Sequence, residues 1–256
     1  MPLTADQAEI RAILRTDRAW SAFALADLEP EYSAPAEWHI AVDGSALVLV
    51  YRAFEAPILF ALGSAEDVAP LLDELAPERT LYAGVREPIS RLLKSRGYRF
   101  ARELEMWRMV LEVSGFTAPP HRATRLGPAD FPELMELFEE GKAAGEGPPL
   151  FHAGMLRDSV FFGVREEGVL AAAAAAPLIA WQEKAAILGM VYTRRSLRGR
   201  GYGFDVSAAV AAVLARLGME MVALNVVQTN AAAIRIYERL GFRRHCDYRE
   251  GVAERA

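Results

Sequence analysis

Three glycines at alternate positions, Gly199, Gly201 and Gly203, follow an apolar run and precede a long stretch with helical periodicity. Glycine lets the backbone turn several amide N–H groups toward one side without interference from Cβ atoms. The first turn of the following helix would add its own free N–H groups and the positive end of its dipole. This arrangement predicts a site for a pyrophosphate group.

Four arginines form the one dense cationic cluster of the chain, and they lie beside these glycines. They are Arg194, Arg195, Arg198 and Arg200. Exposed charges on flexible side chains contribute less to anion binding than fixed amides do, so we expect them to have a secondary role. A simple strand-to-helix turn with surface arginines has the same composition and stays open as the alternative.

Two nucleotide-binding motifs do not fit this turn. The dinucleotide fingerprint requires an acidic residue at the end of the next strand, and residues 219–226 offer Asn225 instead. A triphosphate-binding loop requires a Lys-Ser/Thr pair after the glycines, and none follows here. The sequence therefore disfavours both nicotinamide dinucleotides and nucleoside triphosphates.

The apolar periodicity around the turn predicts the elements that must position it. The expected strands and helices are a hairpin at 160–164 and 169–176, a strand at 185–193, a helix at 201–217, a strand at 219–226, a helix at 230–240 and a strand at 242–248. Gly218 and Gly241 are the predicted helix ends. The glycine-rich turn thus follows one strand and opens one helix.

A chain of 256 residues fits two domains of ordinary size. Glycine and two adjacent prolines in 114–122 indicate a linker, so we expect an N-terminal half at 1–115, a linker at 116–121 and a second domain at 122–256. Residues 80–110 repeat the order strand, helix, Gly-aromatic, strand without the glycine-rich turn. Duplication and chance similarity both stay open.

Composition excludes several classes of protein. The chain is 52% hydrophobic and 25% charged, and its one cysteine, Cys246, leaves no internal disulfide and no multi-cysteine zinc site, so no metal is expected. No segment has the roughly 20 apolar residues that cross a bilayer, and no secretion signal is evident, so we expect a cytoplasmic protein without a membrane partner. The net charge is −6 before residue 120 and +1 after it, which argues against nucleic acid. A monomer and a homodimer are equally compatible.

Two segments in the expected order carry a resemblance to a known family. The first is Arg198-Gly-Arg-Gly-Tyr-Gly203, and the second is Leu224-Asn-Val-Val-Gln-Thr-Asn-Ala-Ala-Ala-Ile-Arg-Ile-Tyr-Glu-Arg-Leu-Gly-Phe242. They resemble the two signature segments of the GCN5-related N-acetyltransferase (GNAT) superfamily. The resemblance covers residues 122–248 and implies an α/β (α+β) fold with a mixed, mostly antiparallel sheet flanked by helices. It also suggests two tandem halves, of which the N-terminal one is degenerate.

The resemblance implies a coenzyme A cofactor and names the residues that bind it. Met190, Val191 and Thr193 on the strand are expected cofactor contacts, the first two through backbone groups offered to the pantetheine arm. The pyrophosphate is expected at Arg198, Gly199, Arg200, Gly201, Tyr202 and Gly203. Asn230 is expected to reach the cofactor, and a helix N-cap is a compatible role for it.

Tyr237 matches the frequent general acid of the family, which protonates the departing thiolate. With a thiol pKa of about 8.5 and a tyrosine pKa of about 10, this transfer is uphill by about 2 kcal/mol. A buried aromatic on a helix face is the alternative role.

The general base stays open, because residues 185–191 contain no carboxylate. Glu183 and Glu146 are the nearest candidates, His152 and His245 are the available imidazoles, and the amine may equally arrive deprotonated. Cys246 is interpreted as a small apolar residue of the last strand.

The favoured function is transfer of an acyl group, by default acetyl from acetyl-CoA, to a primary amine of a small molecule or peptide by direct attack. A sensor that binds acyl-CoA without turnover is the alternative. Aminoacyl transfer from charged tRNA is disfavoured by the acidic N-terminal half.

Overall fold

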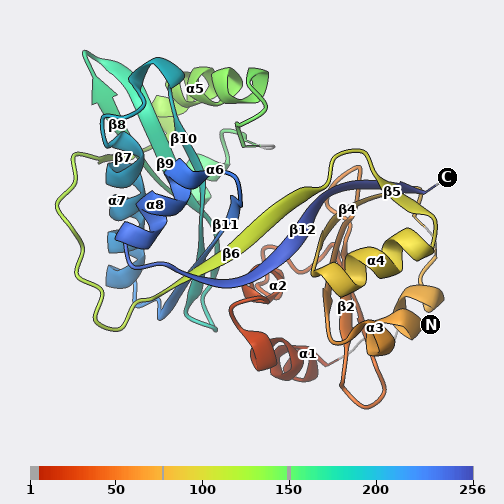
Figure 1. Ribbon diagram of the computed structural model, residues 1–256. Coiled ribbons are helices and arrows are strands. Elements are labelled where there is room, and N and C mark those ends of the chain that lie inside the picture. The colour runs from red at the N-terminus through yellow and green to blue at the C-terminus, as the bar shows by residue number, and fades with distance from the viewer. Residues whose placement is uncertain (1–5, 77, 149–150, 256) are drawn as a thin grey trace. The chain divides into compact units, whose positions relative to one another are not determined.

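The computed structural model describes residues 6–76, 78–148 and 151–255 (Figure 1). These residues form two compact units. Unit 1 comprises the described residues of Met1–Arg108, Val226–Thr229 and Arg244–Ala256, and unit 2 comprises those of Met109–Asn225 and Asn230–Arg243. The chain therefore crosses between the units more than once.

Unit 1 contains a mixed sheet and four α-helices. Its strands are β1 (Ala36–Ile40), β2 (Leu47–Tyr51), β3 (Ile58–Leu62), β4 (Thr80–Val85), β5 (Tyr98–Phe100) and most of β12 (Arg243–Arg255). They lie in the order β1-β2-β3-β4-β12, and β5 also pairs with β12. The helices are α1 (Gln7–Leu14), α2 (Ala22–Ala26), α3 (Ala65–Glu74) and α4 (Glu87–Ser95). Only β3 and β4 are shown to pair in parallel.

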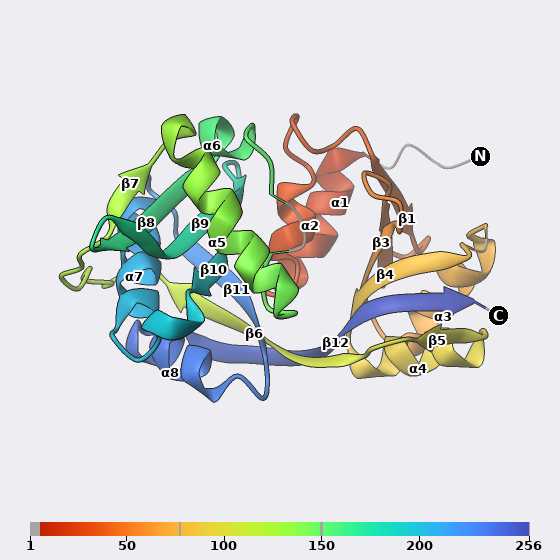
Figure 2. The same cartoon turned by 90° about the horizontal axis from the view of Figure 1, so that it is seen from above.

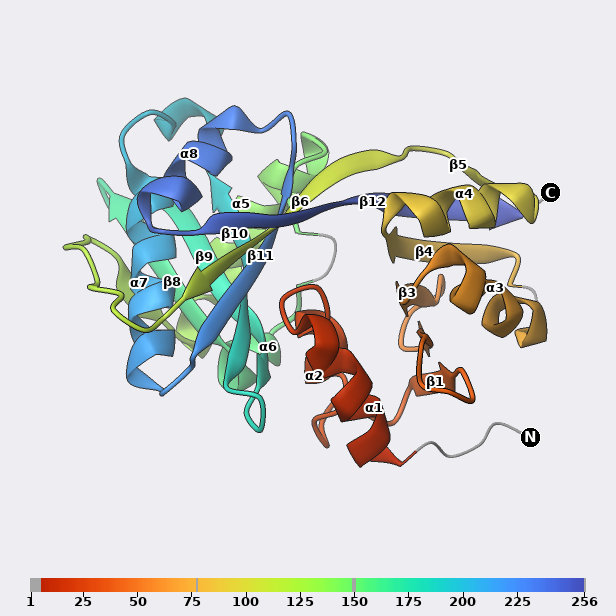
Figure 3. The same cartoon turned by 60° about the horizontal axis from the view of Figure 1, so that its bottom comes forward.

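The core of unit 1 consists of buried strand residues packed against the apolar faces of its helices. All five residues of β2 are buried, which explains its uninterrupted apolar sequence. The apolar faces of α3 and α4 join the same cluster through Val68 and Leu71 and through Ile89 and Leu93. Figure 3 shows these two helices beside β4.

Unit 2 contains the remaining sheet. Its strands are the second part of β6 (Leu104–Glu112), β7 (Thr124–Leu126), β8 (Val160–Glu166), β9 (Val169–Ala180), β10 (Ala185–Thr193) and most of β11 (Met221–Val227). They lie in the order β6-β11-β10-β9-β8-β7. The helices are α5 (Phe131–Ala143), α6 (Met155–Asp158), α7 (Tyr202–Arg216) and α8 (Ala231–Arg239). Strands β7 to β10 pair antiparallel, and β10 pairs with β11 in parallel.

Strand β9 is the centre of unit 2 and is covered on both faces. Its residues from Leu170 to Ala176 are all buried. Ala173 and Ala175 pack in one cluster with the α5 residues Leu137 and Phe138, while α7 also contacts β9 (Figure 2). Because successive residues of a strand face opposite sides, the run of alanines lets two helices approach one strand closely.

The expected fold class is confirmed: the sheet is mixed and mostly antiparallel, with flanking helices. The compact units and the halves expected from the sequence do not coincide. Strand β12 continues to Arg255; its part from Arg244 belongs to unit 1, where residues 249–255 pair with β4 and β5. The segment 116–121 lies within the range of unit 2 rather than between the units.

In the part of the chain that the structure describes, no helix combines the length and the apolar character that crossing a bilayer requires.

Asp27 at the C-terminal end of α2 makes stability depend on pH. Burial raises the pKa of its carboxyl group to about 7, whereas an Asp in an unfolded chain titrates at about 3.9. The folded protein therefore binds this proton more tightly and loses stability as the pH rises from about 4 to about 7.

We expect Asp27→Asn to raise the free energy of unfolding by about 1 to 3 kcal/mol more at pH 8 than at pH 5. Denaturant titrations at both pH values test this, and an equal effect at both would contradict it.

Candidate functional site

Strands β10 and β11 separate part-way along their length. They pair in register at Ala185–Ile187 with Met221–Ala223, while β10 continues to Thr193. On its other edge β10 remains paired with β9, with register shifts on both sides of Gly189. Among the described residues, β10 is not paired with β11 beyond Ile187. An extended ligand can therefore form hydrogen bonds with this part of the β10 backbone, as a neighbouring strand would.

A backbone irregularity marks the same place. Met190 has a φ of +53°, which is uncommon for a residue with a Cβ atom. Such a conformation persists only where the surroundings impose it, and here it coincides with the shifted register between β10 and β9. Met190 and Val191, two of the expected cofactor contacts, thus lie at the irregular part of β10, and both are half-buried.

The glycine-rich turn follows β10 directly. Gly199 and Gly201 have φ values of +81° and +85°, and α7 begins at Tyr202. Within the described chain, no acceptor binds the backbone N–H groups of residues 199–204, and no side chain caps α7. Unpaired N–H groups at a helix N-terminus carry partial positive charge and bind anions. The turn therefore has the geometry expected of a pyrophosphate site.

The third glycine has a different role. A Cβ atom on Gly203 would lie 3.1 Å from Cδ1 of Ile236 and 3.5 Å from Oγ1 of Thr193. Gly203 thus allows the first turn of α7 to approach both α8 and the end of β10. Its function is close packing rather than an unusual backbone angle.

The arginine cluster is electrically paired in the folded protein. The ion pairs are Arg194 with Glu136 and Glu140, Arg195 with Glu146, Arg198 with Glu146, and Arg200 with Glu166. The Arg198 guanidinium also donates to the carbonyl of Thr193 and lies 5.6 Å from the centre of the Tyr192 ring. These arginines brace the turn, so the free amides remain as its main anion-binding groups.

Asn230 is the N-cap of α8. Its Oδ1 accepts a hydrogen bond from the backbone N–H of Ala233 at 3.1 Å. This confirms the capping role, which fixes the start of the helix that carries Tyr237. Contact with the cofactor stays a prediction for Asn230.

Tyr237 is buried on α8, with 6% of its surface exposed. Its ring packs edge-on against Phe242 at a centroid distance of 5.9 Å. Burial raises the pKa of the phenol well above its usual value, so Tyr237 stays protonated through the alkaline range, as a proton donor must. The aromatic packing is present, and the acid role stays a prediction.

The two carboxylates considered as general bases are poorly placed. Glu183 precedes β10, seven residues before Met190, which is about 23 Å along an extended strand. Hydrogen bonds from Arg198 and Arg195 lower the pKa of Glu146, which weakens it as a base. His245 lies in unit 1, where its Nε2 is 2.8 Å from Asp17.

Three further residues, none of them predicted from the sequence, contact the turn or its neighbours. Arg122 donates to the carbonyl oxygen of Arg200 and to the carboxylate of Asp205. Glu166 accepts hydrogen bonds from the guanidinium of Arg200 and the hydroxyl of Tyr202. Arg122 and Glu166 lie 78 and 34 residues from Arg200 in the sequence, so no local spacing could reveal them.

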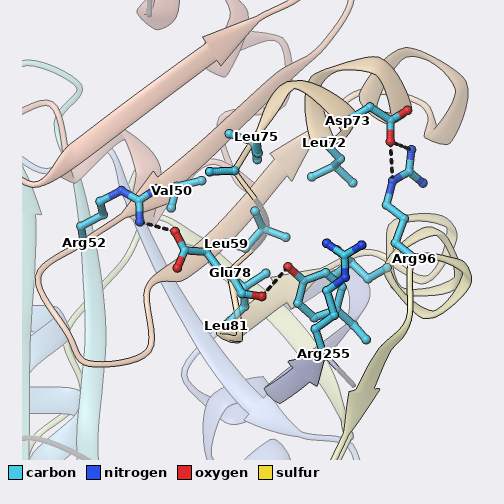
Figure 4. A pocket seen from close by; sticks show the side chains of 13 residues that line it. Val50, Arg52, Leu59, Leu72, Asp73, Leu75, Glu78, Leu81, Arg96 and Arg255 are labelled. Carbon is cyan, nitrogen blue, oxygen red and sulfur yellow. Dashed lines mark hydrogen bonds and ion pairs between the residues drawn. The ribbon is translucent and has the colours of Figure 1, made fainter.

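Unit 1 contains a separate pocket of about 270 Å³ (Figure 4). Its floor is apolar, and its rim holds the ion pairs Arg52–Glu78 at 2.5 Å and Arg96–Asp73 at 2.8 Å. None of the residues expected to bind the cofactor lines this pocket.

A family model matches the segment that contains the turn. The model described as "FR47-like protein" matches residues 162–250. This match contains both the glycine-rich turn and the segment from Asn230 to Tyr237. No curated protein matches the chain significantly.

Solved structures share the fold over most of the chain. A putative acetyltransferase of the GNAT family from Novosphingobium aromaticivorans is 24% identical, with 90% of this chain and 96% of that one covered and a TM-score of 0.60. A GCN5-related N-acetyltransferase from Kribbella flavida is 18% identical, with 92% and 95% covered and a TM-score of 0.62. A tandem GNAT protein from the clavulanic acid biosynthesis pathway is 14% identical, with 82% and 79% covered and a TM-score of 0.53. The chain thus matches the FR47-like model over residues 162–250 and shares, over most of its length, the fold of solved structures that are named as GNAT proteins.

Proposed function

We propose that the protein is an acyl-CoA-dependent N-acyltransferase that transfers an acetyl group from acetyl-CoA to a primary amine of a small molecule or peptide. One observation carries the proposal: β10 leaves β11 after Ile187 and runs into a turn with unpaired amide N–H groups. Coenzyme A has an extended pantetheine arm with a pyrophosphate at one end, and this shape matches a strand that leaves its neighbour and runs into a turn with unpaired N–H groups.

The described residues fit this cofactor. The backbone of Met190 and Val191 would pair with the amides of the pantetheine arm, and Thr193 lies where the strand enters the turn. The N–H groups of residues 199–204 would bind the pyrophosphate. Coenzyme A carries the acyl group as a thioester, which is activated for attack by an amine.

The chemistry needs one proton donor. Attack of a neutral amine forms the C–N bond and leaves an extra proton on the nitrogen, which passes to water. Cleavage of the C–S bond leaves a thiolate that takes up a proton, so the net reaction neither consumes nor releases protons. We assign this proton to the hydroxyl of Tyr237, the residue that the family resemblance identifies as the general acid. Burial keeps it protonated but also raises its pKa, so the transfer is more uphill than from a free phenol. Since β10 carries no carboxylate, the amine is proposed to arrive in its deprotonated form.

The missing carboxylate on β10 also favours the second candidate, a sensor that binds acyl-CoA without turnover. Release of free thiol separates the two. We expect acetyl-CoA and a panel of primary amines to give amine-dependent thiol release, measured with a thiol reagent in a Cys246→Ser background that removes the protein's own thiol. Coenzyme A binding without thiol release across the whole panel would contradict transfer and support the sensor.

Tyr237→Phe removes the proposed proton donor and leaves the ring in its packing with Phe242. We expect kcat to fall by about 10²-fold with little change in the Kd of coenzyme A. Tyr98→Phe, which also deletes a buried hydroxyl but lies in unit 1, serves as the control. Turnover equal to that of the unchanged protein in Tyr237→Phe would remove Tyr237 from the mechanism.

Gly201→Val tests the turn itself. A Cβ atom at position 201 would lie 3.3 Å from Nη2 of Arg122, and the φ of +85° disfavours a β-branched residue. We expect the affinity for coenzyme A to fall at least about tenfold in calorimetry. Gly218→Val is the matched control, because Gly218 has a φ of +80° with no atom near its Cβ position and lies at the far end of α7. Equal losses in both variants would argue against the site.

A further inference from the structure

Arg122 connects a distant part of unit 2 to the glycine-rich turn. It precedes β7, yet its Nη2 donates to the carbonyl oxygen of Arg200 at 2.9 Å and its Nε to Oδ2 of Asp205 at 2.6 Å. The guanidinium also lies 4.7 Å from the centre of the Tyr202 ring. One side chain thus contacts the turn and the first turn of α7 together.

The bond to Arg200 fixes the direction of a peptide group. In a trans peptide the C=O and the N–H point in opposite directions, and this chain has no cis peptide bonds among its described residues. Because the carbonyl of Arg200 faces Arg122, the N–H of Gly201 points away from Arg122. That N–H is one of the unpaired donors of the turn.

Asp205 holds a second carbonyl of the turn and balances the charge of Arg122. Its carboxylate is buried, with the residue 7% exposed, and its backbone N–H donates to the carbonyl of Gly201 at 3.1 Å. The carbonyls on both sides of the Gly201 Cα are therefore held, one by Arg122 and one by Asp205. With its charge paired, Arg122 contributes geometry rather than net attraction for an anion.

We propose that Arg122 is a positioning residue of the cofactor site: it holds the Arg200–Gly201 peptide so that the Gly201 N–H faces the pyrophosphate. This inference rests on the proposed coenzyme A function. The physical gain is preorganisation, because a turn already held in its binding conformation loses less conformational entropy when the ligand binds. Arg122 itself does not touch the ligand.

Arg122→Ala is the primary test. We expect the Kd of coenzyme A and the KM for acetyl-CoA to rise about tenfold, while kcat changes less than about twofold, because the thioester is not involved. Guanidinium added at millimolar concentration should restore part of the affinity of Arg122→Ala. A purely structural role would lower thermal stability without this split between KM and kcat and without rescue.

Arg125→Ala is the matched control. Arg125 also donates to a backbone carbonyl, that of Ser159 at 3.2 Å, and lies 5.8 Å from the centre of the Phe162 ring. It does not contact the turn, so we expect its loss to leave the Kd of coenzyme A unchanged. If Arg125→Ala and Arg122→Ala lower affinity and melting temperature alike, the positioning role is wrong.

A nitrogen-labelled sample gives a direct readout of the peptide group. Addition of coenzyme A should shift the Gly201 amide resonance in the unchanged protein, and this shift should shrink in Arg122→Ala. Unchanged affinity and an unchanged Gly201 shift in Arg122→Ala would overturn this inference and leave the cofactor site in place. A wild-type protein that binds no coenzyme A would overturn both the proposed function and the role of Arg122.

Discussion

The candidate site depends on leaving backbone N–H groups unpaired at the start of α7. Gly199, Arg200 and Gly201 are exposed, so without a ligand their N–H groups bond to water rather than to the protein. Here the surrounding contacts hold the turn open: Arg122 and Asp205 bind its carbonyls, and Glu166 holds the side chains of Arg200 and Tyr202. All of these contacts use carbonyls or side chains, so the N–H groups remain available.

The ion pairs around the turn also leave the backbone N–H groups as its main anion-binding groups. Four arginines near one turn suggest strong electrostatic attraction, but each is paired with glutamate from α5, β8 or the segment after α5. Exposed ion pairs of this kind contribute little net energy, and their sum leaves little excess positive charge. In the proposed site, selectivity for a pyrophosphate would come from fixed amides and the dipole of α7, which cannot be neutralised by a mobile side chain.

Local signals in the sequence predicted the parts of the site that depend on neighbouring residues. The strand expected at 185–193 has those bounds, the glycines expected to turn the chain have positive φ at 199 and 201, and Asn230 caps its helix. Features set by distant segments were not predictable. The φ of Met190 follows from the register of β9, and the partners of the arginines come from segments 34 to 58 residues away. The placement of β12 in unit 1 likewise depends on pairing with β4, which no periodicity encodes.

Unit 1 offers a contrast, because the corresponding helix start there is capped and carries acidic residues. Its β3 also runs parallel to the next strand, β4, with α3 between them in the chain, as α7 stands between β10 and β11. At the start of α3, however, the Ser64 hydroxyl accepts the N–H of Asp67, and Glu66 and Asp67 place two carboxylates in the first turn. Gly63 has a φ of +125°, and a Cβ there would lie 2.7 Å from the Cβ of Ala46, so both the backbone and the packing require glycine at this position. The cap satisfies the N–H of Asp67, and the two carboxylates repel a phosphate. The two helix starts therefore differ in capping and in charge, and both differences favour unit 2 for the proposed cofactor site.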